Sequence, residues 1–548
     1  MDIAQTSDLW WTNAVFYCLD VETFRDGNGD GTGDFRGLTE NIDYLAGLGV
    51  TCIWLMPFYP TANRDDGYDI IDYYAVDPRY GSLGDFVEFL RTARDRGIRV
   101  IADLVVNHTS AEHPWFEASR SDKASPLRDW YVWRDEIPEG ASENLVFPDK
   151  EDSKWELDRK TGQYFLHRFY KHQPDLNITN PDVRDEIRKI IGFWLELGLS
   201  GFRVDAVPFL LETQGASQAM DLAPHDWLRN LRGFLGRRRG DAVLLGEVNL
   251  DYETVREFYG DDGDELHMCL NFNLNQAFAL ALVREDAGAL VHDLRAMPTL
   301  PKAAAWANFV RNHDEWSLDK LTEAERQEVF QAFGPKPDMQ LFGRGLRRRL
   351  PTMLDGDQAR LRMAYSLMFA LPGAPVLFYG EEIGMAENLE IEGRMSVRSP
   401  MQWSDRENGG FSDAAPEQLC RPLIKSKKWG PSSINVAAQE RDGGSLLRWM
   451  EQLIRNRRET PEIALGEWSL APIADPAILA LRYDWGARRS IIIHNLASGA
   501  KKVAFELGAQ GGRPDIVDRL GDGDMEVSPD GTVSLSLAGY GYRWLRLL

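Results

Sequence analysis

Cysteine is scarce in this sequence, with four residues among 548. Cys18, Cys52, Cys269 and Cys420 are widely separated, and the first three lie in apolar runs. This pattern excludes the disulfide framework of a small secreted domain and predicts buried free thiols in a reducing cytoplasm. The sequence also has no apolar run of about 18 residues that could cross a bilayer. Its N-terminus shows no signal peptide, so we expect a cytoplasmic protein without a membrane partner.

Positive charge is in deficit. Lys and Arg number 62 against 85 Asp and Glu, which gives a net charge of −23. Such a surface repels phosphate backbones and anionic lipids, so nucleic acid and membranes are disfavoured as partners. Hydrophobic residues at 43% and charged residues at 27% exclude disorder and fibrous repeats. The length instead favours a large folded core with attached modules.

Short apolar runs rich in β-branched and aromatic residues recur eight times. They span 14–21, 50–57, 99–107, 201–207, 242–248, 266–274, 306–313 and 375–383. Their uniformly apolar character is typical of parallel strands that are buried on both faces. Helical periodicity separates them, for example between Pro181 and Gly198, and further helices are predicted at 224–236, 275–297, 357–371 and 444–458. Eight strand–helix units predict an α/β fold, a (β/α)₈ TIM barrel, although an open doubly wound sheet is the alternative.

Two segments depart from the strand–helix rhythm. Residues 107–177 are too long for a simple loop and are rich in aromatic residues, so we expect a small subdomain inserted after the third strand. Within it, Trp133 and Trp155 are candidates for the rim of a sugar site. Short alternating runs from 466 to 548 predict an all-β C-terminal sandwich domain. The catalytic barrel would then comprise 1–106 and 178–465.

Polar residues gather at the C-terminal ends of the predicted strands, where barrels of this kind place their catalytic groups. These residues are Asp103, Asn107, His108, Arg203, Asp205, Glu247, His313 and Asp314. A set of strand ends this polar is hard to explain by packing alone. Paired carboxylates with a third beside them suit the chemistry of glycoside hydrolysis, in which positive charge develops at the anomeric carbon.

The sequence suggests which of Asp205 and Glu247 is the nucleophile and which is the general acid. Side chains alternate along a strand, so Arg203 and Asp205 share one face. A nearby cation depresses a carboxylate pKa, so Arg203 is expected to keep Asp205 ionised as a nucleophile. Glu247, beside an apolar wall and a second carboxylate, is expected to stay protonated as a general acid.

The motifs at these strand ends resemble those of glycoside hydrolase family 13, the α-amylase superfamily. They are DLVVNH (103–108), QPDLN (173–177), GFRVDAV (201–207), GEV (246–248) and VRNHDE (310–315), in the order of that family. The resemblance implies that Asp205 is the nucleophile, Glu247 the acid/base and Asp314 the third carboxylate. It also implies that His108, Arg203 and His313 bind the sugar whose bond is broken.

Other motifs resemble one branch of that family. Asp65 and Tyr68 in RDDGYDI (64–70) are similar to residues that close the glucose pocket, which implies action on a terminal glucose. QPDLN and RSPMQW (398–403) resemble the oligo-glucosidase, sucrose-isomerising and trehalose synthase branch, and Arg398 there resembles a pocket-rim arginine. Alanine at position 206, directly after Asp205, resembles the residue found in family members that act on α-1,4 bonds.

Within this branch the resemblance is strongest to trehalose synthases, which isomerise maltose to trehalose. Two segments depart from them: GEVN (246–249) stands where trehalose synthases usually carry AEAN, and FLLETQGASQAM (209–220) is shorter than their segment after strand four. Both lie where the second sugar would bind. An α-glucosidase that hydrolyses or transfers α-1,4-linked glucosides is therefore the alternative, and a catalytically inactive sugar-binding or transporter-associated homologue is a remote one.

The segment DGNGDGTGD (26–34) alternates oxygen ligands with glycine, at Asp26, Asn28, Asp30, Thr32 and Asp34. This spacing resembles a calcium loop, although the twelfth position is Gly37 and not the Glu of an EF-hand. A similar loop binds Ca²⁺ in this branch of the family, so a structural Ca²⁺ is expected, with no organic cofactor. The expected partner is a small α-glucoside such as maltose, trehalose, sucrose or a short oligosaccharide. A homo-oligomer is possible.

Overall fold

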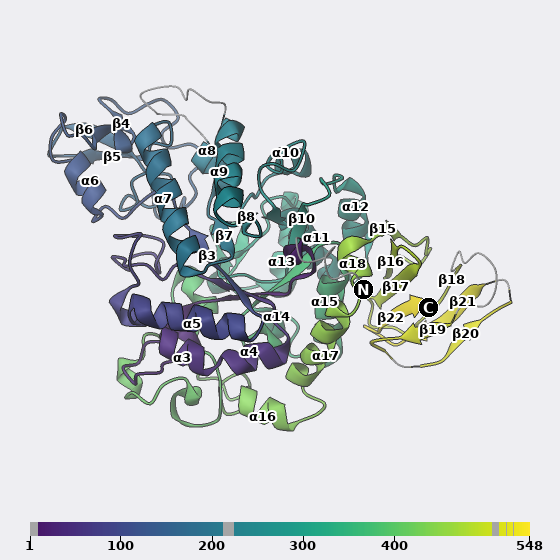
Figure 1. Cartoon of the computed structure of the whole chain (residues 1–548). Coiled ribbons are helices and arrows are strands. Elements are labelled where there is room, and N and C mark those ends of the chain that lie inside the picture. The colour runs from purple at the N-terminus through teal and green to yellow at the C-terminus, as the bar shows by residue number, and fades with distance from the viewer. Residues whose placement is uncertain (1–8, 212–223, 507–514, 522, 530, 548) are drawn as a thin grey trace.

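The eight predicted runs form a closed ring of parallel strands in the computed structural model, which describes residues 9–211, 224–506, 515–521, 523–529 and 531–547 (Figure 1). Around the ring the strands are β1 (Phe16–Leu19), β2 (Cys52–Leu55), β3 (Arg99–Leu104), β7 (Gly201–Val204), β8 (Val243–Gly246), β9 (Met268–Leu270), β10 (Ala305–Phe309) and β14 (Ala374–Phe378). Strand β14 pairs with β1 and closes the ring. The predicted TIM barrel is confirmed, and the open sheet is excluded.

Helices cover the outside of the ring. The longer ones are α4 (Ile42–Leu48), α5 (Leu83–Asp95), α7 (Pro181–Leu197), α9 (Pro224–Arg238), α11 (Phe272–Arg284), α12 (Gly288–Ala296), α13 (Glu323–Phe333), α15 (Gln358–Ala370) and α17 (Leu446–Arg458). The shorter ones are α2 (Val21–Phe24), α3 (Phe35–Glu40), α8 (Val207–Leu211), α10 (Tyr252–Glu257), α14 (Leu350–Met353), α16 (Val436–Arg441) and α18 (Glu462–Leu465).

Local sequence explains where several of these helices begin and end. Helix α7 starts with Pro181 after the cap residue Asn180, whose side chain accepts from the N–H of Asp182, and it ends at Gly198. The single helix predicted at 275–297 was wrong, because Glu285 adopts a left-handed conformation with φ of 53° and separates α11 from α12.

The segment after β3 carries a small three-stranded sheet of its own, beside helix α6 (Pro114–Ser119). Its strands are β4 (Trp133–Arg134), β5 (Trp155–Asp158) and β6 (Gln163–Leu166), in the order β4-β6-β5. The expectation that Trp133 and Trp155 form a sugar-binding rim was wrong. Both rings are buried, since Trp133 stacks on Phe116 and Trp155 packs in the small core of this sheet.

Two antiparallel sheets follow the barrel at the C-terminus (Figure 1). One contains β15 (Glu467–Leu470), β16 (Ile478–Trp485), β17 (Arg488–Asn495), β22 (Tyr542–Leu547) and β19 (Ile516–Asp518), and the other contains β18 (Lys501–Glu506), β21 (Thr532–Leu537) and β20 (Met525–Val527). Trp544 on β22 donates through Nε1 to Ser366 Oγ on α15 at 2.9 Å, and both are buried. This contact fixes the first sheet against the barrel.

Two further findings concern expectations from composition. Among the described residues, no helix is long and apolar enough to cross a membrane. The four cysteines are free thiols, and Cys18, Cys52 and Cys269 are buried in barrel strands as predicted.

Candidate active site

Arg203 lies at the centre of the barrel mouth and is fully buried. Its Nη1 donates to Asp103 Oδ1 at 3.0 Å and to Asp205 Oδ1 at 2.6 Å, while its Nη2 donates to Glu247 Oε2 at 2.6 Å. Strands β3, β7 and β8 are neighbours in the ring, so their C-terminal ends deliver these carboxylates to one guanidinium group. The structure therefore brings together three of the acids that the sequence places at strand ends.

The two carboxylates differ in proton affinity. Burial raises the pKa of Asp205 to about 6, against the lowering effect of Arg203. Burial likewise raises the pKa of Glu247 to about 7. The expectation that Arg203 depresses the pKa of Asp205 below its ordinary value was wrong, because the loss of water outweighs one shared cation. The order of the two pKa values is nevertheless the one the sequence predicts for a nucleophile and an acid.

The backbone also orients Glu247. Ala206 follows Asp205 and has a φ of 49°, a conformation that is uncommon outside glycine. Its N–H donates to Glu247 Oε2 at 3.2 Å. The tight turn after β7 thus ties the residue next to Asp205 to the carboxyl group of Glu247, and the strain of this turn lies at the site itself.

A second set of contacts joins β2, β3 and β10. The hydroxyl of Tyr68 donates to Asp103 Oδ2 at 2.8 Å and lies 2.6 Å from His313 Nε2. The rings of Tyr68 and His313 are nearly parallel, at 8°. His313 Nε2 lies 3.1 Å from Asp314 Oδ2. These contacts fix Tyr68, His313 and Asp314 as one wall of the mouth.

Two arginines of the segment after β14 hold Asp314 from the opposite direction. Arg398 donates through Nη2 to Asp314 Oδ1 at 3.2 Å, and Arg394 donates through Nη1 to the same oxygen at 2.7 Å. Arg394 also donates through Nη2 to Asp65 Oδ1 at 2.7 Å. Although burial opposes it, the contact with His313 and the positive charges of Arg394 and Arg398 hold the pKa of Asp314 well below its ordinary value. Asp314 is therefore ionised.

Arg394 was missed by the sequence reasoning, although it bridges Asp65 and Asp314. A weak signal was present, since Arg394 stands four residues before Arg398 in the polar segment that follows the last barrel strand. Gln173 of the QPDLN motif also reaches this wall, where its Nε2 donates to Asp65 Oδ2 at 3.0 Å. Asp65 is thus held by two side chains, Gln173 and Arg394.

His108 lies against the loop after β2. Its Nε2 is 3.1 Å from the carbonyl oxygen of Tyr68, which can only accept, so Nε2 carries the proton and donates. Burial lowers the pKa of His108, so the ring is neutral near pH 7. The structure places His108 beside Tyr68.

The candidate metal loop, 26–34, folds back on its own backbone. Asp26 Oδ1 accepts from the N–H of Asn28 at 3.0 Å, and Asn28 Oδ1 accepts from the N–H of Asp30 at 2.9 Å. Asp30 Oδ1 accepts from the N–H of Thr32 at 2.9 Å. Burial, together with the charges of Asp26 and Asp30, raises the pKa of Asp34. The candidate donors are all oxygens, the ligand type that a hard divalent cation prefers.

The two departures from trehalose synthases fall in different parts of the structure. Val248 of GEVN is buried, and Asn249 Nδ2 donates to Asp319 Oδ1 at 3.2 Å. Most of FLLETQGASQAM lies outside the described residues, because 212–223 are not described.

Comparison with known proteins assigns this chain to a family. Residues 21–332 and 342–466 match the alpha amylase catalytic domain, and residues 489–546 match a sucrose hydrolase-like C-terminal domain. The chain is 39% identical over 564 residues to a trehalose synthase of Pimelobacter sp. strain R48, with 100% of this chain and 98% of that protein covered.

Similarity extends to a hydrolase and to a solved structure. The chain is 30% identical over 538 residues to a glucan 1,6-alpha-glucosidase of Streptococcus pneumoniae, with 91% and 93% of the two chains covered. The crystal structure of XgtA, an alpha-glucosyl transfer enzyme, superposes with a TM-score of 0.78 at 28% identity, with 98% and 99% covered.

Proposed function

The chain belongs to the α-amylase family, glycoside hydrolase family 13, and from this premise we propose that it converts maltose into trehalose as a trehalose synthase does. The observation that carries the proposal is that one buried guanidinium, Arg203, holds both Asp205 and Glu247. Two carboxylates this close favour the retaining mechanism, in which the pair stands roughly 5 Å apart, over the wider inverting arrangement.

The proposed reaction breaks and re-forms one glucosidic bond. An oxygen of Asp205 attacks the anomeric carbon and forms a covalent glucosyl ester, while Glu247 gives its proton to the departing glucosyl oxygen. Glu247, now ionised, takes a proton from an incoming hydroxyl, and that oxygen displaces Asp205. The anomeric hydroxyl of the released glucose yields trehalose, whereas water yields two glucose molecules.

The contacts around Asp65 support action on a terminal glucose. Arg394 and Gln173 hold Asp65, and Arg394 also holds Asp314, which gathers charged and amide groups beside the candidate catalytic residues. Such groups suit the hydroxyls of one sugar ring. We therefore propose small α-glucosides such as maltose, trehalose, sucrose and short oligosaccharides as substrates.

Product analysis tests this function. The enzyme is incubated separately with maltose, sucrose and trehalose, and the products are resolved by chromatography. Trehalose synthase activity gives trehalose from maltose and maltose from trehalose. The absence of trehalose in the maltose reaction overturns the proposal.

Hydrolysis of α-1,4-linked glucosides is the second candidate. It is favoured by the GEVN segment, in which Gly246 and the buried Val248 stand where trehalose synthases usually carry alanine, while Asn249 is common to both motifs. Such an α-glucosidase gives glucose from maltose and almost no trehalose. An inactive sugar-binding homologue predicts no product from any of the three sugars, which the intact Asp205, Glu247 and Asp314 disfavour.

A structural Ca²⁺ on loop 26–34 is part of the proposal. The donors would be Asp26, Asn28, Asp30, the Thr32 carbonyl and Asp34, all of which are oxygens. Bound there, the ion would favour the ionised form of Asp34, whose pKa is raised mainly by burial. Its role would be stability, since the loop follows β1 and the reacting carboxylates follow β7 and β8.

We further propose that 1–106 with 178–465 act as the catalytic barrel, 107–177 as an inserted subdomain that forms a wall of the site, and 466–548 as a C-terminal β-sandwich domain. The wall assignment is supported by contacts across the mouth. Arg344 Nη2 donates to the carbonyl of Val146 at 2.8 Å, and Lys150 pairs with Glu392 at 2.7 Å. The free thiols suit a cytoplasmic enzyme.

A further inference from the structure

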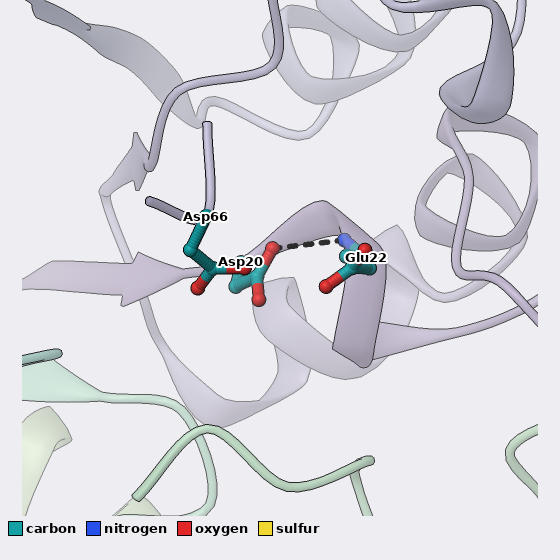
Figure 2. Close-up of side chains that lie close together, drawn as sticks. All are labelled: Asp20, Glu22 and Asp66. Atoms are coloured by element: carbon teal, nitrogen blue, oxygen red, sulfur yellow. Dashed lines mark hydrogen bonds between the residues drawn. The ribbon is translucent and has the colours of Figure 1, made fainter. Parts of the chain in front are cut away.

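Three carboxylates, those of Asp20, Glu22 and Asp66, form a buried acidic cluster (Figure 2). Asp20 and Glu22 follow β1, and Asp66 comes from the loop after β2. Oxygens of the three side chains lie within 4.8 Å of one another. Burial and the charge of Asp66 raise the pKa of Asp20 to about 7. A group of buried like charges is stable only with cations beside it.

Arg421 supplies the first of these cations. Its Nη2 donates to Glu22 Oε2 at 2.7 Å and to Asp66 Oδ1, and it lies 3.9 Å from Asp20 Oδ2. Its Nη1 donates to the carbonyl oxygen of Arg398 at 3.2 Å. One buried guanidinium therefore contacts all three acids and also the backbone of a residue at the pocket.

Arg398 supplies the second cation and reaches the site itself. Its Nη1 donates to Asp66 Oδ2, its Nε donates to the carbonyl of His313 at 2.8 Å, and its Nη2 donates to Asp314 Oδ1 at 3.2 Å. The two oxygens of Asp66 thus face two different arginines. The result is a continuous buried chain, Arg421–Asp66–Arg398–Asp314.

We propose that Arg421 is a positioning residue for cleavage of the glucosidic bond, holding Asp66 so that Arg398 stays against Asp314. The inference rests on the proposed function. If Arg421 is removed, Arg398 becomes the nearest cation to Asp66, and the three acids attract Arg398 more strongly. Nη2 of Arg398 would then leave Asp314. Asp314 would lose one of the contacts that fix its orientation on the sugar.

Arg79 offers a matched control. It pairs with Glu22 Oε1 at 2.9 Å and with Asp77 Oδ1 at 3.1 Å. It therefore neutralises the same acidic cluster, but through Glu22 and not through Asp66 or Arg398. Loss of Arg79 tests whether any missing cation slows the enzyme.

The experiment is a double-mutant cycle on the full chain, with consumption of maltose as the measure of kcat and KM. Arg421→Met, Arg398→Met and the double variant are compared with the wild type, and Arg79→Met is made alone and with Arg398→Met. We expect Arg421→Met to lower kcat/KM roughly 10- to 100-fold, mainly in kcat. The double variant should be no slower than Arg398→Met, since Arg421 acts through Arg398.

Arg79→Met should leave kcat/KM within about twofold of the wild type, and its effect should multiply with that of Arg398→Met. Multiplying losses for Arg421 and Arg398, or an Arg421→Met variant that matches Arg79→Met, would overturn the inference. Arg421→Lys covers a failure of Arg421→Met to fold. Lysine keeps the positive charge but lacks the two-nitrogen guanidinium group, so we expect a smaller loss of kcat/KM than for Arg421→Met. This loss should also vanish in the Arg398→Met background. A loss of kcat/KM that persists there counts against the inference.

The cycle separates this inference from the proposed function. A wild-type enzyme that leaves maltose, trehalose and an aryl α-glucoside intact would overturn the function, and the inference with it. An active wild type whose Arg421 and Arg398 losses multiply would overturn the inference alone.

Discussion

Asp205 and Glu247 share the guanidinium group of Arg203, each with an N–O distance of 2.6 Å. The sharing leaves neither carboxylate fully compensated, since Asp103 also takes part of the same charge at 3.0 Å. Burial consequently prevails in both pKa values, which lie at about 6 for Asp205 and about 7 for Glu247. Between these two pKa values lies a narrow pH range in which Asp205 is mostly ionised and Glu247 is mostly protonated.

That bracket predicts a bell-shaped pH profile for kcat/KM. Activity should rise as pH passes about 6, because Asp205 must be ionised to attack. It should fall as pH passes about 7, because Glu247 must be protonated to assist departure. Initial rates on maltose across pH 4 to pH 9, with constant ionic strength, measure both limbs. A flat profile between about pH 5 and pH 9 would contradict the assignment of the pair.

Asp205→Asn should lower turnover by at least ~10⁴, because the amide cannot form the glucosyl ester. The fold should persist, since Asn keeps the shape of Asp and can still accept from Arg203 Nη1. Steady-state rates and circular dichroism check the two halves of this expectation. Near-wild-type rates of Asp205→Asn, in a preparation verified free of contaminating glucosidase, would contradict the proposed mechanism.

Glu247→Gln should be nearly as damaging on maltose but less damaging on aryl α-glucosides with activated leaving groups. Such leaving groups need little protonation, so formation of the glucosyl ester depends less on the acid. Pre-steady-state rates of aryl release, compared with turnover of maltose, measure the difference. Equal losses on both substrates would show that Glu247 is not the acid.

The barrel was predictable because its strands carry their own signal. A run such as 99–107 is apolar on both faces, and buried parallel strands require that pattern. Trp133 and Trp155 were misjudged because aromatic content does not reveal whether a ring faces solvent or a neighbouring ring. The break between α11 and α12 was missed because the residue with the left-handed backbone is Glu285, and a glycine, the usual sequence signal for that conformation, is absent at this position.

The position of the candidate catalytic groups was predictable for a geometric reason. Parallel strands end at one rim, so Asp205, Glu247 and Asp314 could be placed together without knowledge of the loops. Arg394 and Arg421 could not, because they follow β14 in a short 3-10 helix and in a bend, and the path of this segment depends on packing against distant loops. Arg421 meets Glu22 across 399 positions of sequence, and no periodicity encodes such a contact.

Removal of the proposed Ca²⁺ should affect stability and not chemistry. An ion that binds the folded state stabilises it by mass action, so chelator should lower the melting temperature while the folded fraction stays active. Differential scanning fluorimetry with EDTA, and with added Ca²⁺ or Mg²⁺, checks the shift. Asp30→Asn, in the same loop, should reduce the response. Loss of catalysis with an unchanged melting temperature would show that the ion has a different role.

A label-trapping experiment separates isomerase from hydrolase. An isomerase must retain the cleaved glucose while it turns over, so its pocket must exclude bulk sugar and water. With unlabelled maltose and labelled free glucose, such a pocket should give trehalose that carries little label. An open transglycosidase should incorporate the label, and a hydrolase should give two glucose molecules and almost no trehalose.

For this chain we expect a larger hydrolytic fraction than in a typical trehalose synthase. The expectation rests on the two sequence departures from trehalose synthases, GEVN with its buried Val248 and the segment 209–220, which we propose border the second sugar and lack contacts that exclude water. The ratio of free glucose to trehalose, measured at early conversion of maltose, tests the expectation, and changing GEVN to AEAN by Gly246→Ala with Val248→Ala provides the comparison. That variant should shift the ratio toward trehalose. Negligible free glucose beside abundant unlabelled trehalose in the wild type would refute the expectation and show that these departures leave the pocket closed.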